Sequence, residues 1–340
     1  MENEYFMLKE IREVLDVIDK YKSRKDFDEI KEKILEFNPA SIIIASRGTS
    51  DNAAVFGKYV LESIFKIPVS FASFSLYLWY RSFPFLKNVL GVGISQSGET
   101  VDVVKVIETF NREGSLTLGI TNESDSTLAK ISKISFLLEA GKEHSVAATK
   151  TYSSTLLFFL GLANNLNGIS DFDSIKESVN NVIEKSNDIQ KLVTRYRFAE
   201  SFIILGRGFN YPNALEFALK LRETCLVNAV GYSTVDFLHG PIASLTPETP
   251  VILLMPHDET FESNLEVLKT LISYNADVLV VSDFQDLPSN VFHFYIKEGK
   301  TLEYPVYIAS FLQLFSFYLS IEKKLNPDKP EKLRKVTYGI

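Results

Sequence analysis

The sequence predicts an α/β fold built from two tandem copies of one doubly wound domain, each with a parallel sheet. Two observations predict it. A repeat runs through the chain at a constant offset, and in each copy short apolar segments rich in β-branched residues alternate with segments of helical period. Fully apolar strands that alternate with amphipathic helices are typical of a parallel sheet covered by helices on both faces.

The repeat has an offset of 160 residues. SIIIASRG from Ser41 matches SFIILGRG from Ser201, and the same offset aligns LTLGIT from Leu116 with ADVLVV from Ala276. An offset held for about eighty residues without a gap indicates two copies of one domain, because the period is too long for a solenoid. The segments SIIIA, GVGIS, LTLGIT and ISFLL are the predicted strands of the first copy.

Helices outside the repeat complete the predicted organisation. Apolar residues from Met7 to Ile18 and again at Ile30 and Ile34 recur at helical spacing. Three further segments predict a buried helix, an amphipathic connector and a second apolar helix: Tyr152–Leu166, Asp171–Arg195 and Tyr307–Ile321. We therefore expect N-terminal helices (1–40), a first domain (41–168), a connector and second domain (169–322), and an extended C-terminal tail (323–340).

Composition narrows the class of protein. The 340 residues are 46% hydrophobic and 23% charged with a net charge of −7, which suits a globular protein and disfavours a nucleic-acid partner. Cys225 is the single cysteine, and no His/Asp/Glu set has ligand spacing, so we expect no disulfide, metal or cofactor. The charged N-terminus and apolar runs shorter than the roughly 20 residues of a membrane span predict a cytoplasmic protein without a membrane partner.

The segment ISQSGET, from Ile94 to Thr100, lies at a predicted strand-to-helix turn. Its hydroxyls, a glycine for the tight turn and the free N–H groups of the following helix suit a phosphate dianion. The alternative is that such Ser/Thr/Gly turns are only helix caps. At the equivalent positions the second copy has LMPHDET, in which His257 and Asp258 replace Ser97 and Gly98. An acid and a proline disfavour an anion there, so we expect one copy to bind phosphate.

The acid–base candidates lie in the second copy and the tail. Glu223 ends the helical segment ALEFALKLRE, one turn beyond Lys220, and His239 lies in the loop VDFLHGPIA. Together with Lys335 in the tail, these groups suit proton transfer next to a carbonyl, and a lysine can form an imine. The alternative is that the glutamate and the tail lysine are solvated surface charges.

These motifs resemble the sugar isomerase (SIS) family in its two-domain form. The resemblance runs nearly end to end, through SRGTS, SQSGET, VAATK, LKLRE, the HGP loop and the tail NPDKPEKLRKVT. The chain is similar to the isomerase half of glutamine–fructose-6-phosphate amidotransferase and to archaeal-type glucosamine-6-phosphate deaminases. This resemblance implies flavodoxin-like SIS domains and a sugar-phosphate ligand.

The resemblance also implies binding residues. Four positions match those that hold the sugar phosphate, namely Ser95, Gln96, Ser97 and Thr100, and three match those that line the sugar chain, namely Thr49, Ser50 and Val146. Ala148 stands where many members have a serine, which removes one hydroxyl from the sugar pocket.

For the chemistry, the resemblance implies that Glu223 moves a proton between C1 and C2, with Lys220 as a supporting lysine. His239 matches the ring-opening histidine, which in the family comes from the neighbouring subunit of a homodimer. Lys335 matches the tail lysine that can form a Schiff base with a ketose.

The resemblance and the residues together predict a glucosamine-6-phosphate deaminase. DFLHGP, around His239, is closer to the deaminase-type relatives than the amidotransferase pattern ELKHGP, and Arg222 replaces a common lysine. The chain shows no glutaminase segment with an N-terminal cysteine, so we expect it to act without glutamine. The alternatives are an isomerase or deglycase for fructosamine 6-phosphate or galactosamine 6-phosphate, and a non-catalytic sugar-phosphate sensor.

Overall fold

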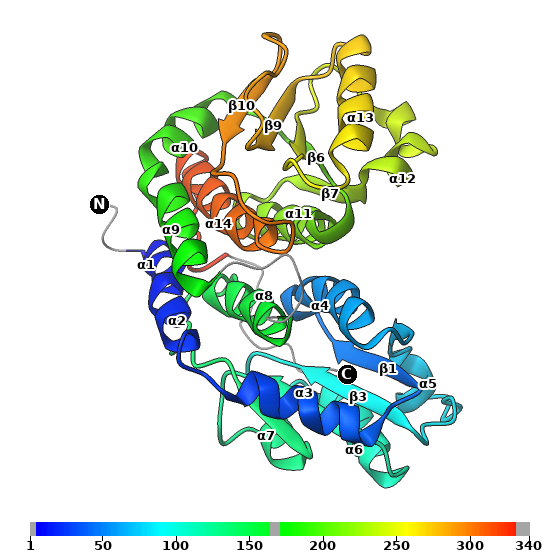
Figure 1. The fold of residues 1–340 in the computed structure, drawn as a ribbon. Helices are drawn as coiled ribbons and strands as arrows, with labels where there is room; N and C mark the ends of the chain where they lie inside the picture. Colours follow the sequence, from blue (N-terminus) through cyan, green and yellow to red (C-terminus); the bar gives the residue numbers. More distant parts are fainter. Residues whose placement is uncertain (1–4, 164–170, 331–340) are drawn as a thin grey trace. The chain divides into compact units, whose positions relative to one another are not determined.

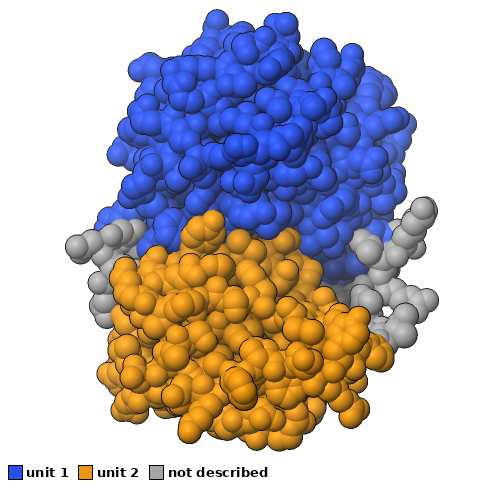
Figure 2. Space-filling model, turned by 90° about the vertical axis from the view of Figure 1, so that its right-hand side faces the viewer, with its two compact units in different colours: residues 1–19, 144–149, 167–333 blue, residues 20–143, 150–166, 334–340 orange. Residues whose placement is uncertain are grey.

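The computed structural model describes residues 5–163 and 171–330, and the chain divides into two compact units. The β1–β5 unit comprises residues 20–143, 150–166 and 334–340, and the β6–β10 unit comprises residues 1–19, 144–149 and 167–333 (Figure 2). Each unit contains one five-stranded parallel sheet with flanking helices, which confirms the predicted fold class. Lys335 lies outside the described residues.

The sheet of the β1–β5 unit has the strand order β2-β1-β3-β4-β5, and every neighbouring pair is parallel. The order reverses direction after β1, so β1 and β3 lie side by side at the centre, where ligands of doubly wound sheets bind. The strands are β1 (Ser41–Ser46), β2 (Val69–Phe71), β3 (Val89–Ile94), β4 (Leu116–Thr121) and β5 (Ile134–Leu137).

Helices cover both faces of this sheet. One face packs against α5 (Phe74–Leu78), α6 (Val101–Arg112) and α7 (Thr127–Ile131) through a core that includes Ile43, Ile107 and Phe110. The other helices are α3 (Asp26–Phe37), α4 (Thr49–Phe65) and α8 (Lys150–Leu162). Helix α8 is buried along its whole length, and α4 lies so close to it that a Cβ at Gly57 would come within 2.2 Å of the Phe159 ring.

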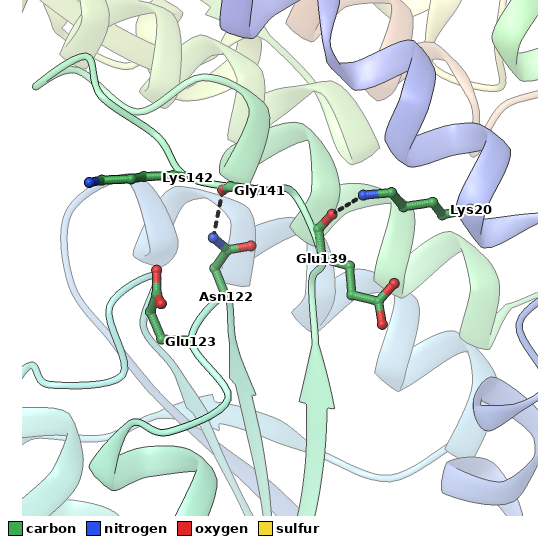
Figure 3. Close-up of a pocket in the computed structure, with 6 residues that line it drawn as sticks. All are labelled: Lys20, Asn122, Glu123, Glu139, Gly141 and Lys142. Carbon is green, nitrogen blue, oxygen red and sulfur yellow. Dashed lines mark hydrogen bonds between the residues drawn. The ribbon is translucent and has the colours of Figure 1, made fainter.

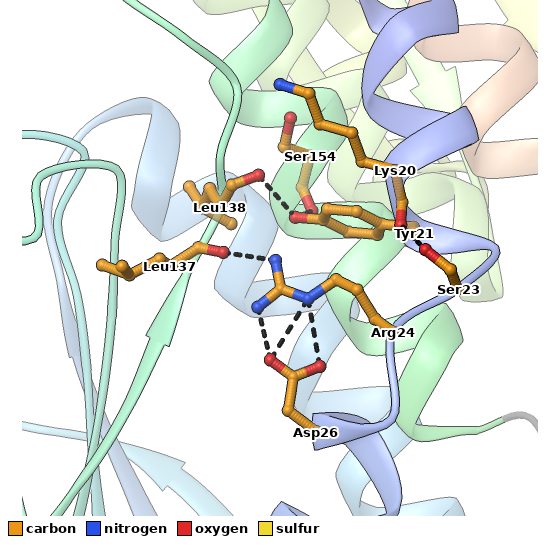
Figure 4. Close-up of polar contacts among 8 residues, drawn as sticks. All are labelled: Lys20, Tyr21, Ser23, Arg24, Asp26, Leu137, Leu138 and Ser154. Carbon is orange, nitrogen blue, oxygen red and sulfur yellow. Dashed lines mark hydrogen bonds and ion pairs between the residues drawn. The ribbon is translucent and has the colours of Figure 1, made fainter.

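The corner before α3 is fixed to the end of β5 (Figure 4). Arg24 donates from Nη1 to the Leu137 carbonyl at 2.6 Å, and the Tyr21 hydroxyl donates to the Leu138 carbonyl at 2.9 Å. Asp26 holds the Arg24 guanidinium, which also lies 3.8 Å from the centre of the Phe136 ring. These contacts fix the chain where it leaves β5 and enters the segment that carries Val146.

The sheet of the β6–β10 unit has the order β10-β9-β8-β6-β7, again entirely parallel. Its strands are β6 (Ser201–Gly206), β7 (Asn228–Ser233), β8 (Val251–Leu254), β9 (Val278–Ser282) and β10 (Phe292–Tyr295). Helices α12 (Thr234–Leu238) and α13 (Phe261–Ser273) pack on one face. The unit also contains α9 (Phe172–Glu184), α10 (Ser186–Val193), α11 (Tyr211–Cys225), α14 (Tyr304–Glu322) and short 3-10 turns (Figure 1).

Helix α14 corrects one expectation. The apolar run from Phe311 was predicted to be too short for a membrane span, but the helix that contains it has 19 residues and passes a length and composition test for one. Its apolar window is 94% buried inside the protein, where it packs against α9, α10 and α11. We therefore assign α14 to the core of its unit.

The offset of 160 residues is repeated in the structure. Strand β1 maps onto β6, and the starts of α6 and α13 are related by the same shift. Both sheets consequently have the same topology. The predicted N-terminal helix is instead two, α1 (Phe6–Arg12) and α2 (Val14–Tyr21), and the predicted connector is interrupted at Lys185 between α9 and α10.

Candidate active site

The SQSGET turn follows β3 and leads into α6. The Ser95 and Thr100 hydroxyls are hydrogen-bonded to each other at 2.8 Å, and the Gly98 N–H donates to Ser95 Oγ at 3.1 Å. Gly98 has φ +64°, and a Cβ there would lie 2.2 Å from Ser126 Oγ, so only glycine fits without a shift. Gln96 and Ser97 are half-buried at the tip of the turn.

The first N–H groups of α6 face this turn without a side-chain cap. Thr100 is the N-cap residue, with φ −63° and ψ 108°, and its side chain makes no capping hydrogen bond. Glu99 points elsewhere, because its carboxylate accepts from the N–H and the hydroxyl of Thr127 at 2.7 and 2.8 Å. An uncapped helix N-terminus with adjacent hydroxyls suits a bound anion.

The equivalent turn in the other sheet is closed by its own side chains. Asp258 Oδ1 accepts from the Thr260 N–H at 2.8 Å and from the Thr260 hydroxyl at 2.6 Å, beside the start of α13. Burial raises the pKa of Asp258, and the hydrogen bonds from Thr260 oppose that shift. A carboxylate therefore occupies the place that hydroxyls and free N–H groups leave open in the first copy.

Thr49 and Ser50 begin α4, directly after β1. Gly48 is the N-cap residue with φ +58°, and Thr49 and Ser50 are half-buried. Because β1 and β3 are neighbours and parallel, the turn with Thr49 and the SQSGET turn lie at the same edge of the sheet. The structure therefore brings together both predicted groups of binding residues in the β1–β5 unit.

Helix α11 carries a buried charge cluster. Lys220 is fully buried; its ammonium lies 3.4 Å from Glu216 Oε1 and forms a shorter contact with Glu223 Oε2. The Glu216 side chain is 1% exposed and that of Glu223 is 20% exposed. Lys220 and Glu216 are therefore not solvated surface charges, and Glu223 keeps one exposed side.

Glu216 was not among the predicted residues. It lies four residues before Lys220, which in a helix places both side chains on one face, so the spacing E-x3-K-x2-E was the available signal. The helix is held tightly against its sheet, because a Cβ at Gly231 of β7 would lie 2.4 Å from the Ala214 carbonyl oxygen.

His239 and Val146 lie elsewhere in the β6–β10 unit. His239 follows α12 on an exposed turn, where its backbone N–H donates to the Asp236 carbonyl and Gly240 has φ +139°. The Val146 N–H donates to the Asp328 carbonyl at 3.1 Å. Within residues 5–163 and 171–330, no group of three or more His, Cys, Asp or Glu side chains is placed to hold a metal ion.

A cavity of about 640 Å³ opens beyond the ends of β4 and β5 (Figure 3). Asn122 fixes its wall by donating to the Gly141 carbonyl at 2.8 Å, and its backbone N–H donates to the Gln96 carbonyl at 3.0 Å. None of the predicted site residues lines this cavity; its lining is Lys20, Asn122, Glu123, Glu139, Gly141 and Lys142. Asn122 thus joins the cavity wall to the SQSGET turn.

A family comparison explains the duplicated architecture. The model of the SIS domain family matches residues 37–164 and 196–323, one stretch for each sheet. The chain therefore belongs to the SIS domain family and contains two tandem copies of that domain.

Individual relatives refine this assignment. The chain is 34% identical over 358 residues to a glutamine–fructose-6-phosphate aminotransferase (isomerizing) of Thermotoga maritima, matching 97% of this chain and 58% of the relative. It thus spans somewhat more than half the length of the curated relatives it matches.

Solved structures support the same fold. The C-terminal domain of a glucosamine-fructose-6-phosphate aminotransferase from Francisella tularensis has a TM-score of 0.87 at 28% identity, covering 96% of this chain and 98% of that one. A glucosamine-6-phosphate deaminase from Thermotoga maritima has a TM-score of 0.72 at 23% identity, covering 97% and 100%, and shows the fold alone.

Proposed function

We propose that this chain is a glucosamine-6-phosphate deaminase, which converts glucosamine 6-phosphate and water to fructose 6-phosphate and ammonia. The observation that carries the proposal is the Glu216–Lys220–Glu223 cluster on α11. Burying such charges is costly unless they are paired, so a stretch of helix that keeps three of them has a use for them.

The SQSGET turn would bind the phosphate. Its hydroxyls and the N–H groups at the start of α6 suit a dianion, and Thr49 and Ser50 at the same sheet edge would contact the sugar chain. Anchoring the phosphate end fixes C1 and C2 at the opposite end of the open-chain sugar. This restriction of orientation is a large part of the rate that an enzyme can supply.

Proton transfer would belong to Glu223. Its carboxylate would remove the proton from C2 and return it to C1, which turns the aldose imine tautomer of the amino sugar into a fructose imine. Lys220 would stabilise the negative charge that develops in between, since its ammonium already contacts Glu223. Water then adds to the imine carbon, and ammonia leaves as the carbonyl forms.

Three further roles rest on the family resemblance. We propose that His239 opens the sugar ring in the site of a second copy of the chain, in a cytoplasmic homodimer. Lys335, outside the described residues, would form a Schiff base with the ketose, and Val146 would line the sugar chain. The exposure of His239 on its own unit is compatible with a partner subunit as its place of action.

The test is an ammonia-release assay with glucosamine 6-phosphate, galactosamine 6-phosphate, fructosamine 6-phosphate and unphosphorylated glucosamine. We expect release from glucosamine 6-phosphate and almost none from glucosamine. Glu223→Gln should lower kcat by about 10²–10⁴-fold with little change in KM. Arg222→Gln, at the exposed neighbouring position, is the matched control and should keep wild-type turnover.

A second candidate is synthesis of glucosamine 6-phosphate, favoured by the 34% identity to aminotransferases. It is measured in the same experiment by supplying fructose 6-phosphate with either ammonium or glutamine. Glutamine-dependent synthesis without ammonia release would replace the deaminase proposal. Binding of sugar phosphates with no turnover in either direction would leave the sensor as the function.

A further inference from the structure

Arg47 lies in the SRGTS turn and is held from two sides. Its guanidinium donates to Asp102 Oδ2 from Nε at 3.2 Å and from Nη2 at 2.6 Å. The carbon atom Cζ also lies 3.7 Å from the centre of the Phe74 ring, at the start of α5. An arginine stacked on an aromatic ring and bonded by a carboxylate has little rotational freedom.

This arrangement places Arg47 beside the start of α6. Asp102 is the second residue of that helix, which begins directly after the SQSGET turn. The guanidinium is therefore within one helical turn of the N–H groups at the helix N-terminus. Among residues 5–163 and 171–330, Nη1 of Arg47 makes no hydrogen bond, and the side chain is 52% exposed. Two N–H donors thus remain for a ligand.

The charges at this sheet edge need a cation. The SQSGET turn itself contains hydroxyls and N–H groups but no basic side chain, and Glu99 and Asp102 lie in or beside it. Asp51, which accepts from the Ser46 hydroxyl at 2.7 Å, adds a further carboxyl after β1. A sugar phosphate brings about two more negative charges, and an arginine fork suits phosphate oxygens.

We propose that Arg47 determines specificity for the phosphate group by supplying its positive charge, with Asp102 and Phe74 as residues that position it. The inference rests on the part of the proposed function that places phosphate at the SQSGET turn, and it adds a residue outside that turn. It is independent of the direction of the reaction and of the role of Glu223.

The second copy offers a matched comparison. Arg207 stands at the equivalent position after β6, and its Nη1 donates to the hydroxyl of Ser263 in α13. The turn beside it is filled by the Asp258 carboxylate, so no anion is expected there. Arg207 therefore tests what an arginine at this position contributes to the fold when it has no phosphate to bind.

The experiment measures binding of glucosamine 6-phosphate and of inorganic phosphate by calorimetry, using the full chain at two salt concentrations. Arg47→Gln should weaken both ligands about tenfold and reduce the salt dependence of binding, because one charge contact is lost. Arg47→Lys, which keeps the charge, should recover part of the affinity. Arg207→Gln should bind both ligands like the wild type.

A purely structural ion pair is distinguished by Asp102→Asn. If Arg47 only fastened α6 to the β1 turn, Asp102→Asn and Arg47→Gln would weaken phosphate equally. If Arg47 serves the phosphate, Asp102→Asn should bind as well as the wild type or more tightly, since the asparagine oxygen still accepts from Nη2 and a nearby negative charge is removed. Wild-type affinity in Arg47→Gln overturns the inference alone, whereas a wild-type protein that binds no phosphate also overturns the proposed function.

Discussion

Replacing Lys220 by methionine would test the charge cluster of α11 most directly. Methionine has a similar length and good helix propensity, so the change removes the ammonium and keeps most of the packing. The carboxylate of Glu216, with 1% of its side chain exposed, would then lose an ion-pair partner 3.4 Å away. Glu223 would lose its contact too, but with 20% exposure it can still be hydrated.

The expected loss follows from that burial. Removing one partner of a buried ion pair costs about 3–5 kcal/mol, because the other charge stays in a poorly solvated place. For a unit of this size that free energy corresponds to a fall in Tm of about 6–20 °C. The double variant Glu216→Leu with Lys220→Met should recover at least half of the loss, since replacing a whole buried pair by apolar groups is often close to neutral.

The assay is denaturation of the full chain by urea and by heat, followed by circular dichroism. Lys269→Met is the matched control: Lys269 pairs with Glu266 on α13, with side chains 61% and 70% exposed, and such a pair is worth about 0–1 kcal/mol. If Lys220→Met and Lys269→Met destabilise equally, or if the double variant is less stable than Lys220→Met, the account of the buried cluster is wrong.

Three more outcomes are expected. Gly98→Ala should lose sugar-phosphate binding measured by calorimetry, because φ +64° and the 2.2 Å approach to Ser126 force the turn to shift; Gly114→Ala, with φ +84° in open space, should bind normally despite a similar backbone strain. Cys225 should resist alkylation in the folded protein at pH 8 and react once urea unfolds it, since burial raises its pKa from 9.0 to about 12. The unfolded thiol releases its proton first, so stability should fall as pH rises from about 9 to 12; rapid alkylation of the folded chain would contradict this. Mixed inactive Glu223→Gln and His239→Ala chains that exchange subunits should recover activity in about a quarter of all sites if His239 acts across a dimer, and none if both residues serve one chain.

Sequence periodicity determined the fold class and the repeat. The offset of 160 residues survives in the structure because equivalent strands begin the same βα units, and β1 and β6 fall at corresponding positions. Apolar β-branched segments report burial on both faces of a sheet, which is a local property of the chain. The glycine at position 98 and the acid at position 258 likewise reported in advance that the two turns differ.

Only the tertiary structure decided which charges are buried. The sequence left Lys220 open between a solvated helix residue and a functional group, because a helix has no buried face until its neighbours are in place. Packing of α11 against β7 and α14 puts Lys220 out of contact with water and adds Glu216 to the cluster. In the same way, Arg47 became a candidate only through Asp102 and Phe74, which are distant in sequence and meet it because β1 and β3 are neighbouring strands. Long-range contacts of this kind leave no periodic trace in the chain, and so the structure alone decides them.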